Sequence, residues 1–224
     1  QFHHRTNPGF LELIKGLVSN RKIVDWLSVC VHGKYIGGTP LQLGDSVAWR
    51  GHSDTEVLLA AVERWGLENA INRCSGMFAI ALWDREARTL HLVRDRLGEK
   101  PLYYGVFDDT LLFGSELKAL RAHPSWSGTV DRNSLSLYLR HNYVPAPYSI
   151  YENVRKIVPG TIATFRSPSA TPEIATYWSA LDVAERGVRN PLSGGDAGSI
   201  AQLDTLMHRV IADEMVSDVP LGAF

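Results

Sequence analysis

Four short strand-like segments follow one another in the middle of the chain, and this succession constrains the fold more than any other feature. They are predicted at residues 76–83, 89–93, 101–107 and 110–113. The connections between them are only a few residues long, which favours antiparallel pairing of neighbouring strands. In the first segment both alternating sets of side chains are apolar, so we expect that strand to be covered on both faces. The pattern therefore predicts a layered α+β sandwich.

Helical patterns flank these strands. The Ser-Asp-Thr-Glu sequence at residues 53–56 is a capping box, in which a hydroxyl and a glutamate satisfy the free N–H groups of a first helical turn. Apolar residues then recur at helical spacing and predict a helix from Asp54 to Trp65, with Gly66 as its C-cap. Other helices are predicted at residues 115–122, 132–142 and 200–214, and one further strand at 160–165.

The C-terminal third has a different texture. Between residues 166 and 204 the chain is polar and rich in Pro, Ser, Gly and Ala, which predicts an irregular linker with a short anchor at residues 177–178. The Ser-Gly-Gly-Asp-Ala-Gly-Ser sequence at 193–199 is similar to a pyrophosphate-binding loop. Such a loop follows a buried strand, however, and the residues before it are polar and include Pro191, so we interpret it as linker.

Composition excludes several classes of function. With 45% hydrophobic and 21% charged residues among 224, the chain is typical of globular proteins. A formal net charge of −1 argues against a general nucleic-acid binder. No apolar run approaches the roughly 18 residues of a membrane span, and no signal-peptide pattern is present. Two cysteines and eight histidines without ligand spacing predict neither disulfides nor a metal site. We expect a cytoplasmic protein.

Residues 94–104, Arg-Asp-Arg-Leu-Gly-Glu-Lys-Pro-Leu-Tyr-Tyr, form a charged connection between two predicted strands. Taken alone, the pattern is typical of a solvated turn with local ion pairs, in which Gly98 supplies a special backbone angle and Pro101 restarts the strand. Its neighbours give it a second interpretation, because five other short motifs accompany it in a fixed order. They lie at residues 51–56, 76–79, 113–120, 143–147 and 217–222.

This ordered set resembles the glutamine-hydrolysing asparagine synthases, from about Trp49 to Phe224. The resemblance implies an N-terminal-nucleophile (class II) glutamine amidotransferase domain, an αββα sandwich, here incomplete at its N-terminus. It also implies the start of an α/β synthetase domain that activates aspartate with ATP and Mg²⁺. We expect no cofactor in this chain, and ATP and Mg²⁺ only in a full-length relative, because the family's phosphate loop would come after the last residue.

The resemblance implies four parts along a chain truncated at both ends. Residues 1–48 are a divergent or frame-disrupted segment, and residues 49–178 are the C-terminal part of the amidotransferase domain. Residues 179–199 are a linker, and residues 200–224 begin the synthetase domain, with an apolar strand at 219–224.

Asp54 is the main candidate for a site residue, because the matching aspartate of the family holds the α-amino group of substrate glutamine. A carboxylate paired with an ammonium group makes a charge-assisted contact. The alternative is an acid that complements the helix dipole in the first turn. Gly33 is a second candidate, since it matches the glycine of the family's oxyanion segment, although His32 and Lys34 do not match their counterparts.

The catalytic nucleophile has no match. The family uses a cysteine at position one, whose own α-amine acts as the base, and this chain begins with Gln1. Cys30 lies in a strand-like apolar run and Cys74 follows a helical segment, so both are predicted to be buried structural thiols. We therefore assign no catalytic residue and expect the isolated chain to be inactive.

Two other functions stay open. One is a non-catalytic fragment that binds glutamine or a partner weakly, and the other is an amidotransferase of specialised or polysaccharide metabolism with a different acceptor. The partners implied are L-glutamine and a synthetase domain or partner chain, with a homodimer as a further option. Neither nucleic acid nor a membrane is expected as a partner.

Overall fold

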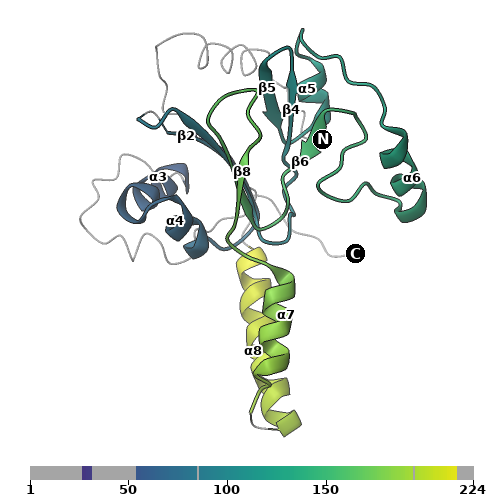
Figure 1. The fold of residues 1–224 in the computed structure, drawn as a ribbon. Helices are drawn as coiled ribbons and strands as arrows, with labels where there is room; N and C mark the ends of the chain where they lie inside the picture. The colour runs from purple at the N-terminus through teal and green to yellow at the C-terminus, as the bar shows by residue number, and fades with distance from the viewer. Residues whose placement is uncertain (1–26, 32–53, 85, 194, 216–224) are drawn as a thin grey trace.

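The computed structural model describes residues 27–31, 54–84, 86–193 and 195–215 (Figure 1). Predictions for Gly33 and for the strand at 219–224 lie outside the described residues, as does the capping serine at position 53. Among the residues that are described, no helix is long and apolar enough to cross a membrane.

The larger sheet has five antiparallel strands in the order β1-β2-β3-β7-β8. They are β1 (Leu27–Val31), β2 (Phe78–Asp84), β3 (Thr89–Arg94), β7 (Thr161–Phe165) and β8 (Glu173–Thr176). Three of these strands were predicted close to these bounds, at 76–83, 89–93 and 160–165. The pairing of β3 with β7 joins segments about 70 residues apart in the sequence, and no local pattern indicates it.

The smaller sheet has three antiparallel strands in the order β5-β4-β6. They are β4 (Tyr103–Phe107), β5 (Thr110–Gly114) and β6 (Val154–Lys156). The prediction that β3 and β4 pair with each other is wrong, because they belong to different sheets. The connection between them does not reverse the chain in a tight turn; it folds around the buried side chain of Asp95 and crosses from one sheet to the other.

Three apolar clusters separate the layers. Helices α3 (Asp54–Trp65) and α4 (Leu67–Arg73) cover the outer face of the larger sheet through a cluster of Leu58, Ile71, Cys74, Phe78, Ile80, Val93 and Ile162. A second cluster fills the space between the sheets, with Ala79, Ala81, Leu92, Leu102, Ile157, Ala163 and Phe165. On the far side, Leu120 of α5 (Leu117–Arg121) packs on the smaller sheet with Phe107, Leu112 and Val154. The order helix, sheet, sheet, helix (Figure 1) confirms the predicted αββα sandwich.

β2 lies between β1 and β3 in the larger sheet, with the helices on one face and the smaller sheet on the other. Phe78 and Ile80 belong to the helix-facing cluster, while Ala79 and Ala81 face the smaller sheet. The expectation that this strand is covered on both faces is therefore confirmed. Small alanines on one face leave room for the second sheet to approach, which is how period-two alternation separates two different environments.

Two predicted helices have the expected ends. α3 spans Asp54–Trp65, and Gly66 follows it with φ of 77° and an N–H bond to the carbonyl of Val62 at 2.8 Å. A positive φ is a conformation that glycine adopts without strain. α6 (Arg132–His141) begins after Asp131, whose carboxylate accepts a hydrogen bond from the N–H of Asn133 at 3.0 Å.

The prediction of an irregular linker is wrong. The segment holds the edge strand β8 and helix α7 (Ala180–Arg189), and α8 (Gly195–Glu214) starts five residues before the predicted position 200. Ser179 caps α7 by accepting a hydrogen bond from the N–H of Asp182 at 3.2 Å. Both helices extend away from the sheets (Figure 1) and expose most of their side chains. The segment resembled a linker because Pro, Ser and Gly lie around α7, although both helices expose large apolar side chains such as Leu181, Val188 and Leu203.

Residues 195–199 form the first turns of α8, and the element before them is helix α7, not a strand. The helix before these residues agrees with the rejection of a phosphate-binding loop, which follows a buried strand, but residues 195–199 are helical and not the irregular linker that was predicted.

Candidate functional site

Asp54 is the first residue of α3. The helix is fixed on the sheet by Leu58, which is only 2% exposed and packs in one cluster with Phe78 and Val93. The start of α3 is therefore anchored close to the positions where β2 begins and β3 ends. The contact of Asp54 with a substrate stays a prediction.

Several strand ends meet at one edge of the larger sheet. Val31, the last residue of β1, pairs with Phe78, the first residue of β2. The neighbouring Ala79 pairs with Arg94, the last residue of β3. Gly33 follows Val31 by two residues in the sequence. Val31, the last described residue before Gly33, is thus paired at the edge where β2 starts.

The carboxylate of Asp95 holds this edge together. The side chain is only 1% exposed, although Asp95 carries an ionisable group. Oδ1 accepts a hydrogen bond from the backbone N–H of Glu99 at 2.9 Å. Oδ2 accepts hydrogen bonds from the backbone N–H groups of Lys100 at 2.9 Å and of Phe78 at 3.3 Å. The backbone N–H of Asp95 donates in turn to the carbonyl of Phe78 at 2.9 Å. Asp95 therefore ties the start of β2 to the connection between the two sheets.

Arg94 closes the same connection from the other side. Its guanidinium donates to three backbone carbonyls, from Nε to Lys100 at 2.9 Å, from Nη1 to Ile157 at 2.8 Å and from Nη2 to Gly98 at 2.6 Å. Burial lowers the pKa of Arg94, and the nearby carboxylate of Asp95 opposes that shift. The interpretation that the pattern alone favoured, residues 94–104 as a solvated turn, is wrong, because the two charged side chains at its start are buried and bound to the backbone.

Two glycines make the tight path possible. Gly98 has φ of 71°, and a Cβ there would lie 2.6 Å from Cγ of Pro159. Gly160 has φ of 69°, and a Cβ there would collide with the carbonyl oxygen of Trp178. The N–H of Gly160 donates to the carbonyl of Asp95 at 2.9 Å. A larger residue at either position would push apart the segments that Asp95 and Arg94 join.

Tyr177 connects this network to the end of the domain. Its hydroxyl donates to the carbonyl of Arg94 at 2.7 Å, and burial raises its pKa. The hydroxyl is therefore neutral and able to donate at physiological pH. Tyr177 lies two residues before Ser179, the cap of α7, so the hydrogen bond links the β3–β4 connection to the segment that enters the C-terminal helices.

Cys74 is the one cysteine side chain in the described part of the chain. It is 3% exposed, and Sγ contacts the carbonyl of Ala70 at 3.3 Å. Burial raises the pKa of the thiol to about 12, against a smaller opposing effect of Arg96. Since the thiolate is the reactive form of cysteine, this group is a poor nucleophile near neutral pH. The prediction that Cys74 packs as a small apolar group is confirmed.

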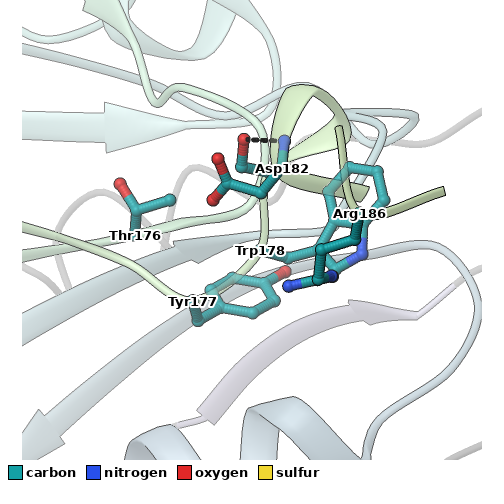
Figure 2. Close-up of a pocket in the computed structure, with 6 residues that line it drawn as sticks. Thr176, Tyr177, Trp178, Asp182 and Arg186 are labelled. Carbon is teal, nitrogen blue, oxygen red and sulfur yellow. Dashed lines mark hydrogen bonds between the residues drawn. The ribbon is translucent and has the colours of Figure 1, made fainter. Parts of the chain in front are cut away.

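A small polar pocket lies where β8 passes into α7 (Figure 2). Thr176, Tyr177, Trp178, Ser179, Asp182 and Arg186 line it. The hydrogen bond between Ser179 and Asp182 fixes the first turn of α7 along one side, and Arg186 comes from the following turn. The pocket belongs to a different part of the chain from Asp54 and Gly33, and its lining is explained by the capping of a helix.

Sequence reasoning missed the buried pair of Arg94 and Asp95, together with Gly160, and it named Tyr177 only as part of a short anchor at residues 177–178. The signal was present in the sequence as a charged pair directly after an apolar strand, followed by a glycine and a proline. Distinguishing it from a surface turn requires knowing that the next strand lies in another layer. Gly33 lies outside the described residues, so its position relative to Asp54 stays a prediction. Within those residues no group of three or more His, Cys, Asp and Glu side chains is arranged to hold a metal ion.

Comparison with known proteins identifies relatives. The chain is 34% identical to asparagine synthetase [glutamine-hydrolyzing] 3 of Bacillus subtilis over 181 residues, which is 78% of this chain and 28% of that protein. It is 31% identical to asparagine synthetase [glutamine-hydrolyzing] 1 of the same organism over 172 residues, 77% of this chain and 26% of that protein. The chain thus spans little more than a quarter of the length of these relatives.

One similar solved structure is a glutamine phosphoribosylpyrophosphate amidotransferase from B. subtilis, complexed with ADP and GMP. The match covers 67% of this chain and 29% of the amidotransferase chain, with 20% sequence identity and a TM-score of 0.46. The family model described as a glutamine amidotransferase domain matches residues 40–178, which is more than half of the chain. The match includes α3 and both sheets apart from β1, and it ends directly before the cap of α7. This chain therefore belongs to the family of glutamine amidotransferase domains.

Proposed function

We propose that this chain is the glutamine-binding part of a glutamine-dependent asparagine synthetase. In that enzyme, glutamine hydrolysis supplies ammonia for the amidation of aspartate by a second part that uses ATP and Mg²⁺. The observation that carries the proposal is the match of residues 40–178 to the amidotransferase family, combined with 34% identity to a synthetase named for glutamine hydrolysis. The αββα layering supports it, because the matched residues form one continuous packed body.

Asp54 is the residue that we propose binds the α-amino group of L-glutamine. As the first residue of α3 it lies at the positive end of the helix dipole, which favours the ionised carboxylate. An ionised carboxylate facing an ammonium group gives a charge-assisted hydrogen bond, about twice as strong as a neutral one. Leu58 and its cluster hold the helix of which Asp54 is the first residue.

Hydrolysis needs a nucleophile as well as a binding site. Cys74 is excluded from this role by its burial and by its raised pKa of about 12. Cys30 lies within β1, where its neighbours pair with β2, and its nitrogen is a peptide nitrogen that cannot serve as a base. We therefore propose that the chain, taken by itself, binds glutamine without hydrolysing it.

The remaining assignments are proposals of the same kind. We propose a cytoplasmic protein that acts on a small amino acid, with neither nucleic acid nor a membrane as its partner. The natural partner is a synthetase part, and a homodimer is the alternative. The balanced charge of 23 basic and 24 acidic residues supports the absence of a polyanionic partner.

Calorimetric titration with L-glutamine tests the proposed binding. The matched probe is glutaramic acid, which keeps the amide and the carboxylate of glutamine but lacks the α-amino group. We expect L-glutamine to bind and glutaramic acid to bind at least about tenfold more weakly, because a charged hydrogen bond contributes roughly 1.5–3 kcal/mol. Equal affinities would contradict a carboxylate–ammonium contact, and no binding of L-glutamine would contradict the proposal as a whole.

Glutamate release from glutamine tests the second part. We expect none above the uncatalysed rate from the purified chain. Release that persists after alkylation of Cys30 and Cys74 would show that a nucleophile other than a thiol works in this protein.

A further inference from the structure

We infer that helices α7 and α8 form the surface on which a second copy of this chain binds. Both helices extend away from the two sheets (Figure 1) and carry large apolar side chains that the rest of the described chain leaves uncovered. α7 contributes three of these side chains and α8 contributes six, each between 41% and 84% exposed. We call these nine side chains the helical apolar surface. The inference does not depend on glutamine binding and goes beyond the proposed function.

The apolar residues of α8 lie along one side of the helix. Intervals of three and four residues bring them onto a common face, which is the pattern of a helix that packs against a neighbour. They are Ile200, Leu203, Leu206, Met207, Val210 and Ile211. Ala201 and Thr205 lie on the opposite face and are exposed as well. On α7, Leu181 and Val188 are two helical turns apart and share a face in the same way.

The exposed apolar area has the size that a stable dimer requires. Complete burial of a Val, Leu, Ile or Met side chain removes roughly 60–120 Å² of apolar surface from water. Nine such side chains, each about half to two thirds exposed, offer roughly 300–600 Å² together. A specific dimer buries about 800 Å² on each partner, of which about 500 Å² is apolar in homodimers. One copy of the chain therefore supplies the apolar area for its half of the contact.

The spacing along α8 is self-complementary. Four residues of the surface follow one another at intervals of three, four and three, so the series reads the same in both directions from residue 205. They are Ile200, Leu203, Met207 and Val210. Two antiparallel copies of α8 place Ile200 opposite Val210 and Leu203 opposite Met207, on both sides of a two-fold axis. A contact of this isologous kind closes at two copies.

The charges of α8 favour a protein partner over a lipid surface. The sequence of the helix contains one arginine, Arg209, and no lysine, and the acid Asp196 lies in its first turn. Helices that lie on anionic membranes carry several Lys and Arg residues on their polar face. The matching area and the self-complementary spacing then commit the helical apolar surface to a second copy.

Sedimentation velocity of the full chain tests the inference. We expect the unmodified chain to sediment as a dimer at about 50 µM. Leu203→Glu combined with Met207→Glu places two charges in the middle of the surface and should raise the Kd of the dimer at least about a hundredfold. The matched control is Ala201→Glu combined with Thr205→Glu, which adds the same charges at the same spacing on the opposite face. This control should change the Kd by less than about threefold.

A dimer that survives Leu203→Glu with Met207→Glu would overturn the inference, because the contact would then lie elsewhere, and equal dissociation of the control would overturn it too. Particles larger than a dimer would contradict the two-fold contact. A monomeric unmodified chain would overturn the inference and assign the surface to a further part of a longer protein or, if the chain co-sediments with phosphatidylcholine–phosphatidylserine vesicles, to a lipid surface.

Circular dichroism checks that each variant keeps its helical content. If Leu203→Glu with Met207→Glu loses it, Leu203→Gln with Met207→Gln takes its place, because glutamine is a good helix former and adds no charge. This variant should raise the Kd of the dimer at least about tenfold, and an unchanged Kd would overturn the inference.

Discussion

The two connections on either side of β3 look alike in sequence and differ completely in structure. The β2–β3 turn is solvated, with Glu86, Ala87 and Arg88 exposed and the carboxylate of Asp84 capping one N–H group. The β3–β4 connection has Arg94 and Asp95 buried and bound to six backbone groups between them. Both are rich in charged residues. Charge alone therefore does not tell a surface turn from an internal support.

The difference arises from where the chain has to go. The first turn reverses the chain within one sheet, so solvent can satisfy its polar groups. The second connection leaves one sheet for the other, and the side chains of Arg94 and Asp95 at its start are buried between the segments that meet there, although Leu97 and Glu99 further along are exposed. Side chains must then supply the hydrogen bonds, since an unsatisfied buried N–H or carbonyl group costs roughly 1–3 kcal/mol.

Removal of the two aspartate carboxylates should show this difference most strongly. We expect Asp95→Ala to lower the free energy of unfolding by about 3–5 kcal/mol, because one buried and two partly buried N–H groups lose their acceptor and Arg94 loses a nearby opposite charge. Asp84→Ala should cost only about 0.5–1 kcal/mol. Urea denaturation of both variants measures the difference, and equal losses would contradict the account of the two turns.

A methyl group at Gly98 should have the next largest effect. We expect Gly98→Ala to lower the free energy of unfolding by about 2–3 kcal/mol, since its φ of 71° is unfavourable for alanine and the new Cβ would lie 2.6 Å from Pro159. The same change at the exposed Gly187, which has nothing within 4 Å of an added Cβ, serves as the control and should be neutral or stabilising. Urea midpoints give the comparison, and a neutral Gly98→Ala would mean that the connection can relax.

Tyr177→Phe should remove one hydrogen bond, to the carbonyl of Arg94, and lower the free energy of unfolding by about 1 kcal/mol. The raised pKa of Tyr177 adds a test by pH. Its contribution is fully present below pH 10.0, the ordinary value, and is lost as pH rises toward the higher folded-state value, because the unfolded chain then binds fewer protons. The stability of the unmodified chain should therefore fall more steeply above pH 10.0 than that of the phenylalanine variant. Parallel curves would argue against a buried hydroxyl.

The smallest effect is expected in the solvated turn. Arg88 has φ of 53°, a left-handed conformation that costs a non-glycine residue roughly 1–2 kcal/mol, whereas glycine loses about 0.5–1 kcal/mol of conformational entropy. We expect Arg88→Gly to raise the free energy of unfolding by about 0.5 kcal/mol. A thermal melt compares the variant with the parent chain, and a clear loss of stability would show that the Arg88 side chain makes contacts of its own.

Much of the fold was predictable because local signals agreed with one another. The capping box and the spacing of apolar residues predicted α3 with both of its ends. The apolar side chains at both alternating sets of positions in β2 predicted that this strand is covered on both faces. The pairing of β3 with β7 was not predictable, since it depends on packing between segments far apart in the sequence. Helix α7 was missed although it carries the apolar residues Leu181, Val183 and Val188, because the Pro, Ser and Gly residues around it gave the whole region the composition of a linker.

The candidate site was predictable only in part. Asp54 was found through a family motif, and the structure adds the anchored helix on which it lies. Asp95 was visible in the sequence but looked like one acid in a charged turn. Its importance comes from three N–H donors belonging to segments that only the folded chain brings together, and no spacing rule reports such a convergence.

The most direct test of the account is the affinity of Asp54→Ala for L-glutamine. The matched control is Asp131→Ala, which removes an aspartate from the start of another helix, α6. Calorimetric titration should show saturable binding to the unmodified chain, binding at least about tenfold weaker in Asp54→Ala, and an unchanged Kd in Asp131→Ala. Equal affinity of Asp54→Ala and the unmodified chain for L-glutamine would contradict the account.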